Sequence, residues 1–338
     1  MWQGIRVGLA FSPSAYLKRP GAGPVLAFVH IPKTAGATVT SMFVGAYTEA
    51  GVGGAGNFFR YPKETRATIA RARWTGHWRG TQVVVGHVPY GLFASNLARD
   101  TRYMTFLREP VDRVLSHYHR HIARRSLSPM SLEEALKRRM PEMNNLATRC
   151  LCGDPSPLGD LPPGAVQEAK ANLSAFAFVG IQERFDESVV LLQRMLGLDL
   201  IPYFNRHVST GRPAVDDLPD EKRRLIRAYN RLDVELYDFA LERFGEVMAV
   251  TDERFALDVE RMRALSRDAN EKEIQKASEW LDRELAGETT WPRATLYAAA
   301  TAAGVPEPAL KHVLARASLE KVTDKDGQKV FRRSRASP

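Results

Sequence analysis

Short runs of apolar residues, each ending abruptly at polar residues, alternate along this chain with segments of helical pattern. Residues 25–31 (VLAFVHI) are the clearest run, because they are rich in β-branched and aromatic side chains and have turn-forming residues on both sides. The other strands, and then the helices, are expected at 82–85, 103–107 and 176–181, and at 39–50, 111–124 and 188–196. This alternation predicts an α/β fold in which helices flank a parallel sheet.

The composition is that of a globular protein large enough for one sizeable domain and a smaller one. The chain has 338 residues, of which 44% are hydrophobic and 26% charged. No apolar run approaches the roughly 20 residues that a membrane-spanning helix needs. Residues 1–24 lack the ordered regions of a signal peptide, so we expect a cytoplasmic protein. The formal net charge of +9 suits an anionic partner or solubility alone.

Changes of pattern divide the chain into three predicted parts. Residues 1–257 carry the strand and helix alternation, with a glycine-rich loop expected at 51–56. Residues 258–285 have charges of alternating sign, which predicts an exposed linker helix. Residues 286–338 read as two short helices around a glycine turn and a hairpin, the outline of a small winged-helix-like module.

A polar turn joins the first predicted strand to the first predicted helix. Its residues, any of which could contact a bound anion, are Lys33, Thr34, Ala35, Gly36, Ala37 and Thr38. A turn that leads into a helix directs free backbone amides and the positive end of the helix dipole at an anion. The lysine comes too early for the Walker pattern. The alternative is a plain turn in which Lys33 pairs with a carboxylate.

A second candidate anion site follows the predicted strand at 103–107. Arg108 leaves the strand, Pro110 suits the first turn of a helix, and Ser116 lies two turns further on. Arg108 offers a planar pair of donors for phosphate, and Ser116 could hold the same anion. We expect Arg113 on a different face of the helix, as a surface residue or paired with a glutamate.

Together these two segments resemble the donor-binding signatures of the sulfotransferase superfamily, whose members use 3′-phosphoadenosine-5′-phosphosulfate (PAPS). The likeness is greatest to carbohydrate O-sulfotransferases, particularly the uronyl 2-O type. It covers most of residues 24–248 and includes weaker matches at 144–149, 180–188 and 230–237.

The resemblance implies a P-loop-like sulfotransferase fold and an enzyme that sulfates a hydroxyl, with a saccharide as the expected acceptor. It implies that residues 33–38 hold the donor's 5′-phosphosulfate, with Lys33 also catalytic, and that Arg108 and Ser116 hold its 3′-phosphate. The family commonly has a hydroxyl residue directly after the loop glycine, where this chain has Ala37, so one side-chain hydrogen bond is lost.

His87, in the run GHVPY, is the expected general base. Sulfuryl transfer requires that the acceptor hydroxyl lose its proton, and a histidine that is neutral near pH 7 can take it. His87 follows a predicted strand that lies between the two anion motifs in sequence, and GHVPY also resembles the segment that carries the catalytic histidine in uronyl 2-O-sulfotransferases. A purely structural histidine is the alternative. His117, His119 and His121 spread around a helix, which favours surface or packing roles.

Two other functions stay open on the sequence. A phosphotransferase that uses ATP is disfavoured by the missing Walker lysine and by the lack of an acidic magnesium ligand after a strand. Nucleic-acid binding by the C-terminal module would use the basic residues between 321 and 335. No metal site is expected, because Cys150 and Cys152 have no second cluster of ligands at zinc spacing.

Overall fold

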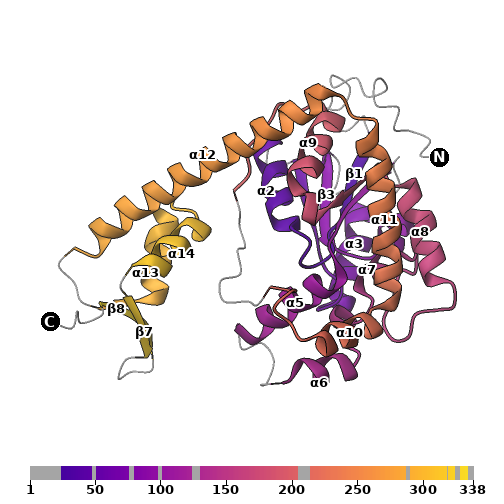
Figure 1. The fold of residues 1–338 in the computed structure, drawn as a ribbon, viewed down its shortest axis with the longest axis horizontal. Helices are drawn as coiled ribbons and strands as arrows, with labels where there is room; N and C mark the ends of the chain where they lie inside the picture. Colours follow the sequence, from indigo (N-terminus) through magenta and orange to yellow (C-terminus); the bar gives the residue numbers. More distant parts are fainter. Residues whose placement is uncertain are drawn as a thin grey trace. The chain divides into compact units, whose positions relative to one another are not determined.

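The computed structural model describes residues 24–47, 51–75, 80–97, 101–123, 130–204, 214–286, 290–317, 319–323 and 328–333. The chain forms two compact units (Figure 1). The larger comprises Met1–Ile201 and Ser209–Glu260, and the smaller comprises Pro202–Val208 and Arg261–Pro338. Among the described helices, none combines the length and the apolar character that crossing a membrane requires.

A five-stranded parallel sheet lies at the centre of the larger unit, which confirms the predicted fold class. The strands have the order β2-β3-β1-β4-β5, so β1 is in the middle. Their bounds are β1 Val25–Val29, β2 Val52–Asn57, β3 Val83–His87, β4 Thr101–Leu107 and β5 Phe178–Ile181. In such a sheet, ligands bind beyond the carboxyl ends of the strands, where the connections diverge.

Helices cover both faces of the sheet, as a parallel sheet requires. Their bounds are α2 Gly36–Ala46, α3 Pro62–Thr75, α4 Tyr90–Asn96, α5 Pro110–Ala123, α6 Leu132–Lys137, α7 Leu146–Leu151, α8 Ala165–Ala175, α9 Phe185–Leu196, α10 Asp220–Tyr229 and α11 Arg231–Ala249. Single turns of 3₁₀ helix lie at Pro141–Met143 and Gln182–Arg184.

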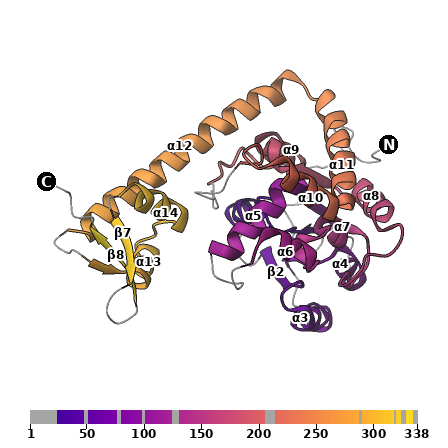
Figure 2. The same cartoon turned by 60° about the horizontal axis from the view of Figure 1, so that its bottom comes forward.

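Alternation along the strands separates two apolar cores. In β1, Val25 and Val29 join one core with α3, α4, α7, α8 and α11, whereas Leu26 and Phe28 join another with α2 and α9. A third cluster links α5, α6 and α10, which lie side by side in Figure 2. Because both faces of β1 are buried, its sequence is apolar throughout, and this is why the strand was recognisable.

The glycine-rich segment 51–56 was expected to be a loop, and this expectation was wrong. Residues Val52–Asn57 form β2, which pairs in parallel with β3 at the edge of the sheet, with a register irregularity between Gly54 and Asn57. Glycine is unfavourable in strands because it adds no packing and loses much conformational entropy. The backbone hydrogen bonds to β3 are independent of side chains, so sequence composition gave no sign of them.

The smaller unit has its own core and contains the elements expected near the C-terminus. Helices α13 (Arg293–Ala302) and α14 (Glu307–Arg316) accompany an antiparallel sheet of order β6-β8-β7. Its strands are β6 Thr290–Pro292, β7 Leu319–Thr323 and β8 Lys329–Arg333, while the expected hairpin turn at 326–327 lies outside the described residues. The start of a separate winged-helix-like module at residue 286 stays a prediction.

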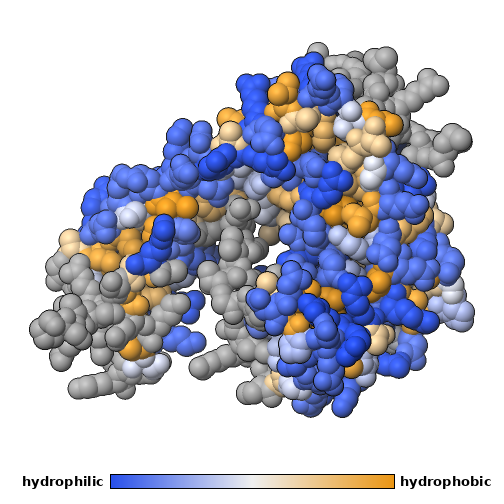
Figure 3. All heavy atoms as spheres, in the orientation of Figure 1, coloured by the Kyte–Doolittle hydropathy of each residue, from blue (hydrophilic) through white to orange (hydrophobic). Residues whose placement is uncertain are grey.

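The predicted linker helix, 258–285, forms most of an element that begins five residues earlier. Helix α12 runs without interruption over Glu253–Glu284. The visible face of this helix is largely hydrophilic (Figure 3), as its alternating charges predict. Ala277, Trp280 and Leu281 are buried in the core of the smaller unit, so its last turns also contribute packing.

We expect Gly180→Ala to lower the free energy of unfolding by about 1–3 kcal/mol, a typical penalty for overpacking. Gly180 faces Phe106 across the β4–β5 pair, and an added methyl carbon would lie 2.5 Å from the Phe106 ring. Gly54→Ala is the matched control, because its methyl group would meet no atom within 4 Å. Denaturant unfolding of both variants is the measurement, and equal stabilities would contradict the expectation.

Candidate active site

The turn between β1 and α2 has the backbone of an anion-binding loop. Lys33 and Ala35 both have positive φ values, 76° and 63°, which non-glycine residues rarely adopt. The Thr34 hydroxyl donates to the Ile31 carbonyl at 2.9 Å and so holds the turn from within. Helix α2 begins without a side-chain cap at Ala35. Its N-terminus therefore keeps the amide donors and the dipole that suit a phosphate or sulfate group.

Gly36 is required by the close approach of His30. A β-carbon at position 36 would lie 2.1 Å from two atoms of the His30 ring, far inside contact distance. That ring stacks on Phe28, with centroids 5.2 Å apart and planes at 14°. The end of β1 thus supports the phosphate loop directly, and any side chain at position 36 would displace the loop.

His87 lies at the end of β3, next to the same loop. Its Nδ1 is 2.6 Å from the His30 carbonyl oxygen, and its ring centroid is 4.2 Å from that of His30. A backbone carbonyl only accepts hydrogen bonds, so His87 Nδ1 carries the hydrogen and donates it. In the neutral ring, Nε2 then has the lone pair that can accept a proton.

The surroundings of His87 favour its neutral form. Burial lowers the pKa of His87 below its ordinary value; the hydrogen bond to His30 raises it in part, and the charge of Arg120 lowers it further. The pKa of His30 is also lowered, by burial first and then by His87. A histidine that stays neutral at pH 7 can act as a general base.

Arg108 follows β4 and reaches the phosphate loop. Its Nη1 donates to the Lys33 carbonyl at 3.2 Å, and its Nε donates to Asp112 at 2.8 Å. Arg108 and residues 33–38 are therefore brought together, as the two motifs predicted. Ser116 is buried in α5 with 4% of its surface exposed, and it is not among the residues lining the pocket beside Arg108.

The placement predicted for Arg113 was wrong. This residue has 1% of its surface exposed, and its three guanidinium nitrogens have no hydrogen-bond partner among the described residues. It lines a small pocket together with Thr34, Arg108, Asp233 and Tyr237. Burial lowers the pKa of Arg113, and Asp233 is the main nearby charge that opposes this effect. The apolar residues on both sides of it, Val111 and Val114, were the available sign of burial.

Helices α7 and α11 cap each other's first turns beside this pocket. The Asp233 carboxylate accepts hydrogen bonds from the Ala147 and Thr148 amides at 3.0 and 2.8 Å and from the Thr148 hydroxyl at 2.9 Å. In return, the Asn145 side-chain oxygen accepts from the Leu232 and Asp233 amides at 3.0 and 3.2 Å. This reciprocal capping gives a structural reason for the weaker motifs at 144–149 and 230–237.

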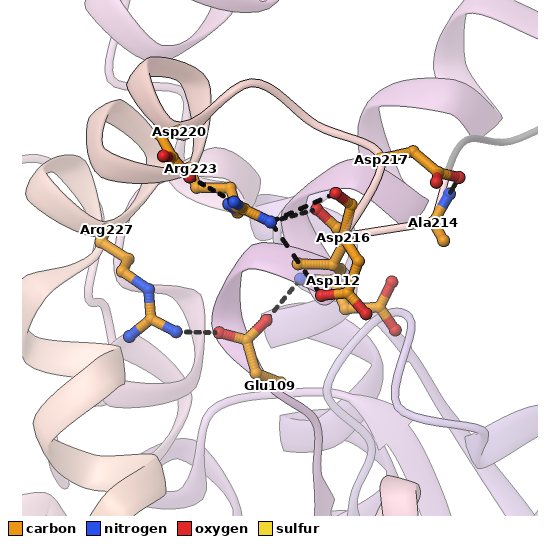
Figure 4. A network of polar contacts seen from close by, with 9 residues as sticks. Glu109, Asp112, Ala214, Asp216, Asp217, Asp220, Arg223 and Arg227 are labelled. Atoms are coloured by element: carbon orange, nitrogen blue, oxygen red, sulfur yellow. Dashed lines mark hydrogen bonds and ion pairs between the residues drawn. The ribbon is translucent and has the colours of Figure 1, made fainter.

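Helix α10 supports the start of α5 from outside (Figure 4). Arg227 forms an ion pair with Glu109 at 3.2 Å, and the other Glu109 oxygen accepts from the Asp112 amide at 2.8 Å. Arg223 on the same helix pairs with Asp220 and Asp216. The residue after Arg108 is thus anchored to a second element, which limits the movement of the Arg108 backbone.

Three remaining sequence candidates have different outcomes. His117 is buried with 6% of its surface exposed, which agrees with a packing role. The side chain of His121 lies outside the described residues. Cys150 and Cys152 are buried, unpaired thiols, and burial raises the pKa of both.

We expect nitrogen NMR to show His87 as the tautomer protonated at Nδ1, with a titration midpoint below the ordinary histidine pKa of about 6.5. The physical reasons are the hydrogen bond to the His30 carbonyl and the burial of the ring. A ring protonated at Nε2, or a midpoint above 6.5, would contradict this geometry.

Comparison with known proteins relates this chain to carbohydrate sulfotransferases. The sequence profile of the family described as galactose-3-O-sulfotransferase matches residues 8–283. Galactose-3-O-sulfotransferase 3 of Mus musculus is 32% identical over 161 residues, which are 41% of this chain and 36% of that protein. Heparan-sulfate 6-O-sulfotransferase 3-B of Danio rerio is 30% identical over 184 residues, 43% of each chain.

These curated relatives are matched over less than half of their own length. A crystal structure of a sulfotransferase from Alicyclobacillus acidocaldarius aligns with 65% of this chain and 96% of its own, at 15% identity and a TM-score of 0.39. The family profile and the named relatives confirm the carbohydrate sulfotransferase superfamily suggested by the two motifs, while the uronyl 2-O likeness stays a prediction. The profile covers most of the chain, which belongs to the galactose-3-O-sulfotransferase family.

Proposed function

We propose that this protein is an O-sulfotransferase that transfers a sulfuryl group from PAPS to a hydroxyl of a carbohydrate. The observation that carries the proposal is the meeting of three strand ends: the phosphate loop after β1, His87 at the end of β3 and Arg108 after β4. The named carbohydrate sulfotransferases among the relatives support the choice of acceptor class.

The residues present fit the donor. The N-terminus of α2 has no side-chain cap, Gly36 has no room for a side chain, and the Arg113 guanidinium has no hydrogen-bond partner in the described part of the chain. These are features of a site for phosphate and sulfate groups. Ala37 supplies no hydroxyl, so the loop would bind there through its backbone alone.

In this mechanism the bound donor supplies an electrophilic sulfur and a phosphate leaving group. His87 Nε2 accepts the proton of the acceptor hydroxyl as the new bond from oxygen to sulfur forms and the bond from sulfur to the phosphate oxygen breaks. Lys33 and the loop amides stabilise the negative charge that develops on that phosphate oxygen. Arg108 and Ser116 would hold the 3′-phosphate, and the proton on His87 then passes to solvent.

Calorimetric titration with adenosine 3′,5′-bisphosphate (PAP), the desulfated donor, tests this proposal. We expect micromolar or tighter binding by the wild-type protein, little binding of ATP, and a loss of about tenfold or more in Arg108→Ala, because a charge-assisted hydrogen bond is removed. Tight ATP binding without PAP binding would favour the phosphotransferase alternative. No binding of either nucleotide would refute the proposed donor.

The pH dependence of turnover tests the role of His87. Protonated His87 cannot accept a proton, so kcat/KM should fall as the pH falls through the lowered pKa of His87, and should stay constant from there up to neutral pH. His87→Gln should lower kcat by about 100-fold or more. A pH profile that is unchanged in His87→Gln would show that another group is the base.

A further inference from the structure

Two arginines line the small pocket beside the phosphate loop, and they differ in how their guanidinium groups are hydrogen-bonded. The Arg108 guanidinium forms an ion pair with Asp112 and also donates to the Lys33 carbonyl. Arg113 is buried, and in the described part of the chain none of its three guanidinium nitrogens has a hydrogen-bond partner. Arg113 is therefore the arginine of this pocket whose hydrogen-bond donors are unused among the described residues.

The Asp233 carboxylate, which lines the same pocket, forms no hydrogen bond with Arg113. It accepts instead from two amides and a hydroxyl at the start of α7. A buried guanidinium without hydrogen bonds is costly, since water has been removed and nothing replaces it. An anionic ligand would remove that cost.

The pocket has the size and lining for one polar atom of such a ligand. Its volume of about 10 Å³ accommodates one water-sized group, which is also the size of one phosphate oxygen. Thr34 of the phosphate loop and Tyr237 of α11 complete the polar lining. Arg113 would thus meet one oxygen of an anion whose remaining atoms lie toward Arg108.

We propose that Arg113 is a specificity-determining residue, which recognises the 3′-phosphate of the nucleotide and so distinguishes a 3′,5′-bisphosphate from a 5′-monophosphate. This inference rests on the proposed function and adds to it, because the family resemblance gave that phosphate to Arg108 and Ser116 only. Asp112 already uses part of the Arg108 guanidinium, whereas the Arg113 donors are unused among the described residues, so Arg113 adds hydrogen bonds to the dianion that Arg108 alone does not supply.

The test compares PAP with AMP, which lacks only the 3′-phosphate, in calorimetric titrations of four proteins. These are the wild type, Arg113→Met, Arg113→Lys and the control Arg149→Met. Arg149 is also buried, at 3% exposure, but it donates to the Asn144, Pro157 and Gly159 carbonyls at 2.8, 3.0 and 2.6 Å. Thermal unfolding of each ligand-free protein, and its shift by inorganic phosphate, complete the set.

In Arg113→Met we expect PAP affinity to fall about 10- to 100-fold while AMP affinity changes less than about twofold. Its Tm without ligand should not fall, because the group removed is a buried guanidinium that makes no hydrogen bond among the described residues. Arg113→Lys should lie between the wild type and Arg113→Met, and it carries the test if Arg113→Met does not fold. Arg149→Met should lower Tm and change the ratio of the two affinities little.

Equal losses for PAP and AMP in Arg113→Met, or no loss for either, would overturn the inference and leave the proposed function intact. If the wild type does not bind PAP, the assignment of PAPS as donor is refuted. The role of Arg113 is then tested by the shift in Tm that inorganic phosphate causes. A phosphate-induced rise in Tm that disappears in Arg113→Met would support Arg113 as an anion site. A rise that persists in that variant, or no rise in the wild type, would refute it.

Discussion

The rest of the candidate site depends on how His30, directly after β1, is packed. Its ring occupies the space above Gly36, and its carbonyl oxygen accepts the hydrogen bond from His87 Nδ1. One residue thus fixes both the phosphate loop and the tautomer of the expected base. The stacking of His30 on Phe28 connects this arrangement to the buried core of the sheet. The geometry of these groups therefore depends on packing at the end of a regular strand.

Packing, as well as residue type, decides which charged side chains in the site are paired. Arg108 and Arg113 are five residues apart, yet one is paired with Asp112 and the other is buried without a hydrogen-bond partner among the described residues. Asp233, which might have neutralised Arg113, instead caps α7. Because the Asp233 carboxylate is used in capping α7, the guanidinium donors of Arg113 are left for another acceptor, which suits an anion.

Much of the fold was predictable because its signals are local. Four strands of the sheet lie where apolar runs end at polar turns, and parallel sheets bury both faces of such strands. The exception was β2, whose glycines give no strand signal and which forms by backbone pairing with β3. Lys33, His87 and Arg108 were recognisable as site candidates because each follows a strand, and the carboxyl ends of parallel strands meet at one edge.

The sequence by itself determined the strand ends, the phosphate loop and the residue types placed there, since these depend on a few neighbouring positions. Only the tertiary structure decided which nitrogen of His87 carries the hydrogen, why position 36 must be glycine and where the charge of Arg113 lies. Each of these depends on atoms from segments distant in sequence: the His30 carbonyl, the His30 ring, and the capping of α7 by Asp233. Contacts between distant segments leave no periodic pattern in the chain, so spacing and composition do not reveal them.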